Sequence, residues 1–142
     1  MISLVTVEEL PKVVDLAQWF YCRLNPQGEF SRESFLSAWT NILRGGMGFI
    51  MKRGDLEAIG VLIYPDPYDG KLAAGTAFWY VAGDDNSLAC GMLHRELETA
   101  LRKHGVSKIF FSNLIHFRYG RVEKFLLHAG YQPVEVHFRK DL

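Results

Sequence analysis

The sequence has few cysteines, no excess of charge of either sign and no long apolar run. Its 142 residues include only two cysteines, Cys22 and Cys90, which lie far apart and form no Cys-x-x-Cys pair. This spacing argues against a disulfide framework and against a zinc site, and it favours a reducing cytoplasmic location. Lysine plus arginine and aspartate plus glutamate number 16 each, so the broad basic surface of a nucleic-acid-binding protein is missing. We therefore expect no nucleic acid as the main partner.

Signals for a membrane or a metal are also missing. No stretch reaches the roughly 18 uninterrupted apolar residues of a membrane-spanning helix, and the first residues lack the basic start of a signal peptide. We expect neither a signal peptide nor a membrane partner. The five histidines never occur as HExxH or as a pair four residues apart, so no metal site is predicted.

What the sequence does contain is enough apolar material for a core. Apolar residues make up 49% of the chain, and its length is typical of one domain. We therefore predict a single domain over residues 1–142 that needs neither disulfides nor metal to fold.

The periodicity of apolar residues predicts alternating helices and strands. Thr6 followed by Glu9 has the pattern of a capping box, and Arg53-Gly54-Asp55 has that of a hairpin turn. Strands are expected at 1–6, 49–52, 58–64, 77–81, 109–111 and 134–138, and helices at 10–24, 31–43, 88–101 and 119–128. Because antiparallel strands come first and crossover helices follow, the predicted fold is α+β, with a mixed central sheet of about six strands and four flanking helices.

The junction between the strand that ends at Val81 and the next helix is the first candidate site. The beginning of a helix presents unpaired backbone N–H groups that bind phosphate, provided that the side chains there are small. Ser87, Ala89, Cys90 and Gly91 are all small. From the residues alone, an ordinary loop capped by Asn86 or Ser87 is an equal alternative.

In the order of its elements and at this junction, the sequence resembles the GNAT superfamily of acyl-CoA-dependent N-acyltransferases. The family's pyrophosphate loop has the form Q/R-x-x-G-x-G/A, and its six positions fall here on Asn86, Ser87, Leu88, Ala89, Cys90 and Gly91. The strand 78–81 and the segment 130–138 look like those of small phage and bacterial members. The resemblance implies that the N–H groups from Leu88 to Gly91 hold the pyrophosphate of acetyl-CoA, while Tyr80 and Val81 pair with its pantetheine arm. It further implies acetyl transfer to a primary amine of a small molecule or a protein.

Three positions depart from the family pattern. Leu126 stands where many relatives have a tyrosine acid, Tyr119 stands where an asparagine is common, and Thr76 stands where small relatives often have a glutamate base. Tyr119, His116 and Tyr80 are the candidate catalytic replacements, each with a purely structural alternative. A GNAT-fold protein without catalysis, used for binding or in an assembly such as a phage particle, is therefore the alternative function. The acceptor and the oligomeric state, including a homodimer, stay open.

Overall fold

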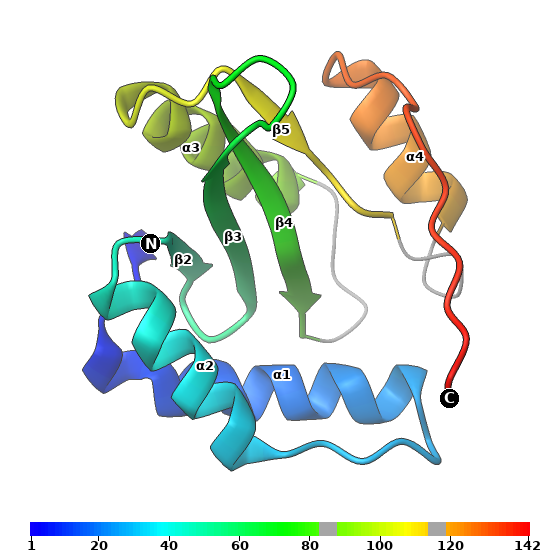
Figure 1. The fold of residues 1–142 in the computed structure, drawn as a ribbon. Helices are drawn as coiled ribbons and strands as arrows, with labels where there is room; N and C mark the ends of the chain where they lie inside the picture. The colour runs from blue at the N-terminus through cyan, green and yellow to red at the C-terminus, as the bar shows by residue number, and fades with distance from the viewer. Residues whose placement is uncertain (83–87, 114–118) are drawn as a thin grey trace. The chain divides into compact units, whose positions relative to one another are not determined.

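The computed structural model describes residues 1–82, 88–113 and 119–142, without the side chains of residues 88–90 and 119. The chain divides into two compact units, Met1–Ser112 and Asn113–Leu142. The first unit contains a mixed five-stranded sheet with helices on both faces (Figure 1). The second contains one helix and an irregular tail.

The N-terminal segment forms the predicted strand, capping box and helix. Strand β1 (Ile2–Leu4) is followed by a 3-10 turn (Val7–Glu9) and by α1 (Leu10–Leu24). The Glu9 carboxylate accepts hydrogen bonds from the Thr6 N–H at 3.0 Å and from the Lys52 ammonium at 2.9 Å. These bonds satisfy an N–H group that the start of the helix would leave unpaired, and they join that start to strand β2 (Gly48–Arg53).

We expect the pH dependence of stability to reveal the Glu9 contacts. The hydrogen bond from Lys52, and then the one from Thr6, lower the pKa of Glu9 to about 2 from the ordinary 4.5. The stabilisation is therefore present above about pH 4.5 and is lost as the pH falls towards about 2, because the unfolded chain binds the proton more readily. Urea unfolding of Glu9→Gln over this range should show a smaller pH dependence than the wild type; an equal dependence would contradict this assignment.

The helices α1 and α2 (Arg32–Arg44) cover one face of the sheet. The Ser34 N–H donates to the Ser31 hydroxyl at 3.1 Å, which caps α2 where the sequence predicted its start. The packed residues on this face come from both helices and from the strands, and one cluster of buried residues comprises Val5, Leu10, Val13, Leu16, Trp39, Ile50, Ala58 and Phe78.

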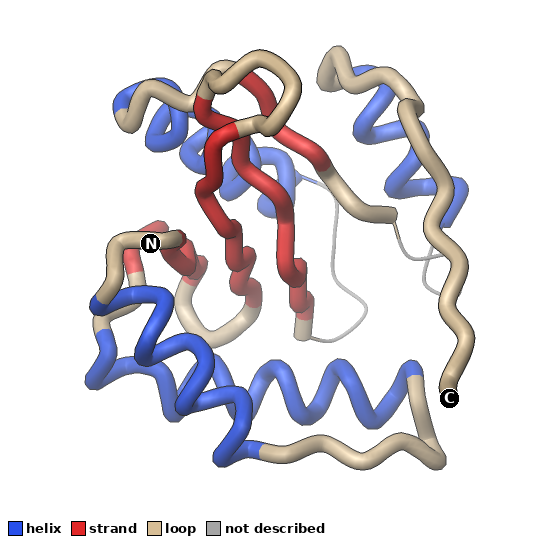
Figure 2. Tube along the Cα trace, in the orientation of Figure 1, coloured by secondary structure: helices blue, strands red, loops and turns tan. Residues whose placement is uncertain are grey.

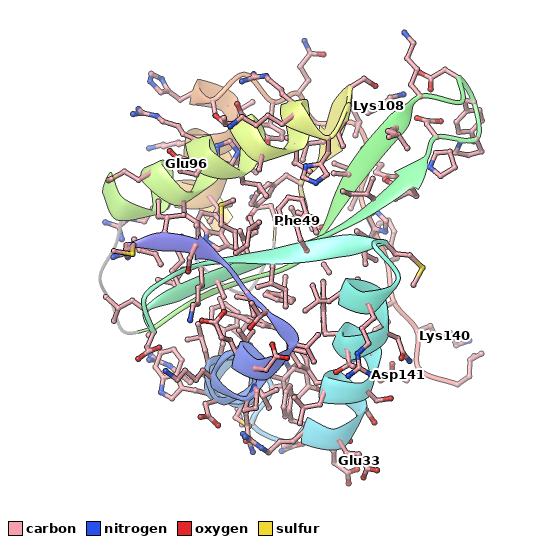
Figure 3. The ribbon with its side chains drawn as sticks, turned by 90° about the vertical axis from the view of Figure 1, so that its left-hand side faces the viewer. Glu33, Phe49, Glu96, Lys108, Lys140 and Asp141 are labelled. Carbon is pink, nitrogen blue, oxygen red and sulfur yellow. The ribbon has the colours of Figure 1, made fainter. Side chains whose placement is uncertain are left out.

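The strands lie in the order β1-β2-β3-β4-β5 (Figure 2). The predicted hairpin is confirmed: β2 pairs antiparallel with β3 (Glu57–Pro65), which pairs antiparallel with β4 (Leu72–Val81). Strand β5 (Lys108–Phe110) runs parallel to β4, because α3 (Leu88–Lys103) provides the crossover between them. Helix α3 thereby covers the second face of the sheet, and Phe49 lies in the apolar layer between β2 and this helix (Figure 3).

The second unit confirms one prediction and corrects another. Helix α4 (Tyr119–His128) has the predicted bounds. The predicted strand at 134–138 is wrong: residues 131–142 have neither helix nor strand, and Val134 and Phe138 are 70% and 95% exposed. Alternating apolar residues become a strand only when a neighbouring strand offers hydrogen bonds, and the described residues of this unit include none. The described part of the chain therefore has five strands instead of about six.

No helix among the described residues combines the length and the apolar character needed to cross a bilayer.

Candidate functional site

The strands β4 and β5 pair over a short distance and then separate. Their parallel register joins Ala73, Ala74 and Gly75 to Lys108, Ile109 and Phe110, whereas β4 itself continues to Val81. Opposite this part of β4, the register with β3 shifts: Gly60 pairs with Phe78 and Val61 pairs with Thr76, which leaves Ala77 as a bulge. A bulge bends its strand and increases the local twist, so it accounts for the separation. We call the region from Thr76 to Val81, facing away from β3, the β4–β5 divergence.

Thr76 marks where the ladder ends. The Ser112 N–H donates to the Thr76 hydroxyl oxygen at 2.9 Å, so a side chain takes over from the backbone just past the last strand pair. A carboxylate base at this position would also accept that N–H. The Thr76 hydroxyl has no comparable basicity, and in the described structure it holds the chain after β5 against β4.

On the α3 side of the sheet, a buried carboxylate holds an aromatic ring beside the divergence. Glu57 in β3 has no exposed surface, and its carboxylate accepts from the Trp79 indole N–H at 2.6 Å and from Arg53 Nε at 3.1 Å. The Trp79 ring meets Phe111, just after β5, edge to face, with ring centres 5.4 Å apart. His94 of α3 lies beyond, 5.9 Å from Phe111 between ring centres.

On the α1 side, Tyr80 is stacked among other aromatic rings. Its ring lies parallel to Phe78 with ring centres 4.4 Å apart, and it contacts Phe20 of α1 at 5.2 Å. Burial raises the pKa of Tyr80 to about 12, since the phenolate would lose its hydration. Tyr80 is therefore protonated at neutral pH, and its hydroxyl is available as a hydrogen-bond donor.

Some of the predicted site residues lie within the described structure, and others lie outside it. Tyr80 and Val81 form the last two positions of β4, next to each other and opposite Ala58 and Glu57 of β3. The first turn of α3 contains the next four predicted residues, Leu88, Ala89, Cys90 and Gly91. Tyr119 begins α4 in the second unit. The predicted residues Asn86, Ser87 and His116 lie outside the described residues.

Glu57 is the site residue that the sequence-based prediction missed. The predicted turn covered Arg53-Gly54-Asp55 and the predicted strand began at residue 58, so Glu57 was assigned to neither. A signal was present: Glu57, Ile59, Val61 and Ile63 alternate with period two, so a glutamate occupies the buried face of an apolar strand. A carboxylate on the buried face of a strand is rarely stable unless it is paired, so this pattern indicates that Glu57 has a partner.

A cleft lies at the end of β4, between α1 and the turn that joins β2 to β3. Its volume is about 330 Å³, and it is lined by Lys12, Asp15, Leu16, Trp19, Asp55 and Ala82. The Asp15 carboxylate pairs with the Arg32 guanidinium at 2.8 Å. No group of three metal-ligating side chains gathers here or elsewhere in the described part of the chain.

No protein-family model and no curated protein matches the sequence. Solved structures do match it over nearly its full length. A probable acetyltransferase has a TM-score of 0.77 at 15% identity, with 100% of this chain and 96% of that chain covered. An aminoglycoside acetyltransferase from an uncultured soil metagenomic sample has a TM-score of 0.75 at 11% identity, with 100% and 97% covered. A predicted acetyltransferase from Clostridium acetobutylicum, solved with acetyl-CoA, has a TM-score of 0.75 at 12% identity, with 99% and 95% covered.

These similarities confirm the fold predicted from the sequence. The chain has the fold of the GNAT-type acetyltransferases, a mixed sheet flanked by helices.

Proposed function

We propose that this protein is an acyl-CoA-dependent N-acyltransferase that moves an acetyl group from acetyl-CoA to a primary amine. The observation that carries the proposal is the β4–β5 divergence, in which β4 runs on past its last pair with β5 and leads to the first turn of α3. The extended pantetheine arm of acyl-CoA could form hydrogen bonds with the edge of β4 there. The solved acetyltransferases of the same fold add support.

The binding of acetyl-CoA would use backbone groups more than side chains. Tyr80 and Val81 would pair with the pantetheine arm along β4. The N–H groups from Leu88 to Gly91 would receive the pyrophosphate, because the first N–H groups of a helix lack partners within it and lie at the positive end of its dipole. Asn86 and Ser87 would complete the loop before the helix.

The transfer itself requires few protein groups. The neutral amine attacks the carbonyl carbon of the thioester, a C–N bond forms, the C–S bond breaks, and the amine proton leaves as the CoA sulfur gains one. Holding the amine and thioester in line contributes much of the rate. Tyr80 ends β4 one residue before Val81 and is protonated at neutral pH, so it is the proposed donor to the departing sulfur. Tyr119 and His116 are the alternative acids.

We expect Tyr80→Phe to lower kcat for acetyl transfer by about 100-fold with little change in the KM for acetyl-CoA, because loss of a general acid typically costs 10²–10⁴ in rate. Tyr21→Phe is the matched control, since this α1 tyrosine is connected to Tyr80 by successive ring contacts of Phe30, Phe35 and Phe78. Full activity in Tyr80→Phe, together with loss in Tyr119→Phe, would assign the proton donor to Tyr119 instead.

Binding of acyl-CoA without transfer is the second candidate function, and two residues favour it. Leu126, 8% exposed, stands where many relatives have a tyrosine acid, and Thr76, which accepts a hydrogen bond from Ser112, stands where small relatives often have a glutamate base. Thiol release from acetyl-CoA in the presence of a panel of primary amines separates the two functions. Amine-dependent release supports the transferase, whereas a rise in Tm with acetyl-CoA but no release with any amine supports binding alone.

A further inference from the structure

We infer that Glu57 is a positioning residue: it holds the Trp79 indole so that Trp79 and Phe111 close the α3 side of the β4–β5 divergence and leave the thioester of a bound acyl-CoA accessible only from the other side. The inference rests on the proposed function, because it concerns the same stretch of β4. It adds a residue that touches none of the reacting atoms and acts through Trp79.

The Glu57 carboxylate is held by one donor on each oxygen. Oε1 accepts from the Trp79 indole N–H at 2.6 Å, and Oε2 accepts from Arg53 Nε at 3.1 Å. Glu57 has no exposed surface, and the Arg53 side chain is 21% exposed. A buried carboxylate is unfavourable unless it is paired, and hydrogen bonds to a charged acceptor are shorter and stronger than neutral ones. The indole is therefore fixed more firmly than packing alone would fix it.

The position of the fixed indole matters because of where β4 and β5 separate. Trp79 lies beyond the last β4–β5 pair at Gly75 and Phe110, and Phe111 is the residue that follows β5. Their rings meet at 89°, with centres 5.4 Å apart, in the apolar layer that also contains the buried α3 residues Leu93 and Leu97. Side chains thus occupy the α3 side of the divergence.

The opposite side of β4 carries Tyr80 and Phe78, which pack against α1 and α2. If Trp79 and Phe111 close the α3 side of the divergence, the pantetheine arm lies along the edge of β4. Its thioester is then accessible from the side of the sheet that bears Tyr80. The Glu57–Trp79 contact thereby decides from which side of the sheet the amine can approach. A loosened indole would enter the space that the arm needs.

Two single variants test this role. Glu57→Gln keeps the shape but replaces one acceptor oxygen with an NH₂ group, so either Trp79 or Arg53 must face another donor. Trp79→Phe removes the indole N–H and leaves the Glu57–Arg53 pair intact, which gives a second variant should the first fold poorly. Glu9→Gln is the matched control, because it also removes a carboxylate paired with a cation on β2, away from β4.

The readouts are the Kd for acetyl-CoA by calorimetry and the indole ¹⁵N–¹H signals by NMR. We expect both variants to weaken acetyl-CoA binding five- to tenfold, Glu9→Gln to stay within twofold, and the Trp79 indole signal to move upfield in Glu57→Gln. The Glu57→Gln/Trp79→Phe double variant should bind acetyl-CoA no more weakly than whichever single variant has the higher Kd, because the two substitutions remove the same contact.

Variants that bind acetyl-CoA as tightly as the wild type would overturn the positioning role and leave the proposed function standing. A wild-type protein that binds no acetyl-CoA would overturn the proposed function, and this inference with it.

Discussion

Replacing Gly91 by glutamate is expected to abolish the rise in Tm that acetyl-CoA produces in the wild-type protein. Gly91 lies in the first turn of α3, whose N–H groups would receive the pyrophosphate. Two unit charges about 4 Å apart repel by about 4 kcal/mol near a protein surface, so binding should weaken by at least about 100-fold. Ligand at 100 times its Kd stabilises by about 2.7 kcal/mol, and this gain should disappear.

The variant should not be less stable without ligand, because an acidic residue in the first turn interacts favourably with the helix dipole. Thr99→Glu is the control: it adds the same charge at an exposed position later in α3 and should keep the response to acetyl-CoA. If the Gly91→Glu protein still binds acetyl-CoA with wild-type affinity, the pyrophosphate does not bind at this turn.

Replacing Gly60 by alanine is expected to destabilise the fold by about 1–3 kcal/mol, the usual cost of overpacking a core. A Cβ atom at Gly60 would meet the Phe78 ring, with Cζ at 2.6 Å, and the Trp39 ring, with Cη2 at 2.9 Å. Phe78 of β4 is buried against Trp39 of α2 and stacks on Tyr80, so its ring cannot move without disturbing that stack. Urea unfolding measures the loss of stability.

Gly75→Ala is the matched control for Gly60→Ala. It lies on the other side of the bulge, at the last pair between β4 and β5, and its nearest neighbour would be Tyr64 Cε1 at 3.4 Å, an ordinary contact. Because glycine within a strand is itself unfavourable compared with alanine, this variant should lose no stability. If both variants lost the same free energy of unfolding, lack of space for a side chain could not be the reason for a glycine at position 60.

Much of the fold could be predicted because local signals agree with the tertiary structure. Glu9, Ser31 and the Arg53-Gly54-Asp55 turn each specify a helix start or a hairpin through contacts within a few residues, and the structure contains all three elements. Helix α4 was predicted from the periodicity of its apolar residues and from Gly130 as its end. Where the signal depended on a distant partner, prediction failed: the alternation at Val134 to Phe138 indicates a strand, but a strand also needs a neighbour.

The candidate site was less predictable for the same reason. The resemblance predicted cofactor-binding positions at Tyr80, Val81 and the first turn of α3. It could not reveal that β5 stops pairing at Phe110, that Ser112 donates to Thr76, or that Trp79 donates to Glu57 from 22 positions away. Such contacts depend on strand register, which the bulge at Ala77 alters.

The most direct test of the central claim is an NMR titration of the ¹⁵N-labelled protein with CoA. If the start of α3 receives the pyrophosphate, the largest amide shifts should fall on residues 86–91, with smaller shifts at Tyr80 and Val81, and the wild type should saturate. No saturable shift, or shifts confined to residues away from the end of β4 and the start of α3, would contradict it.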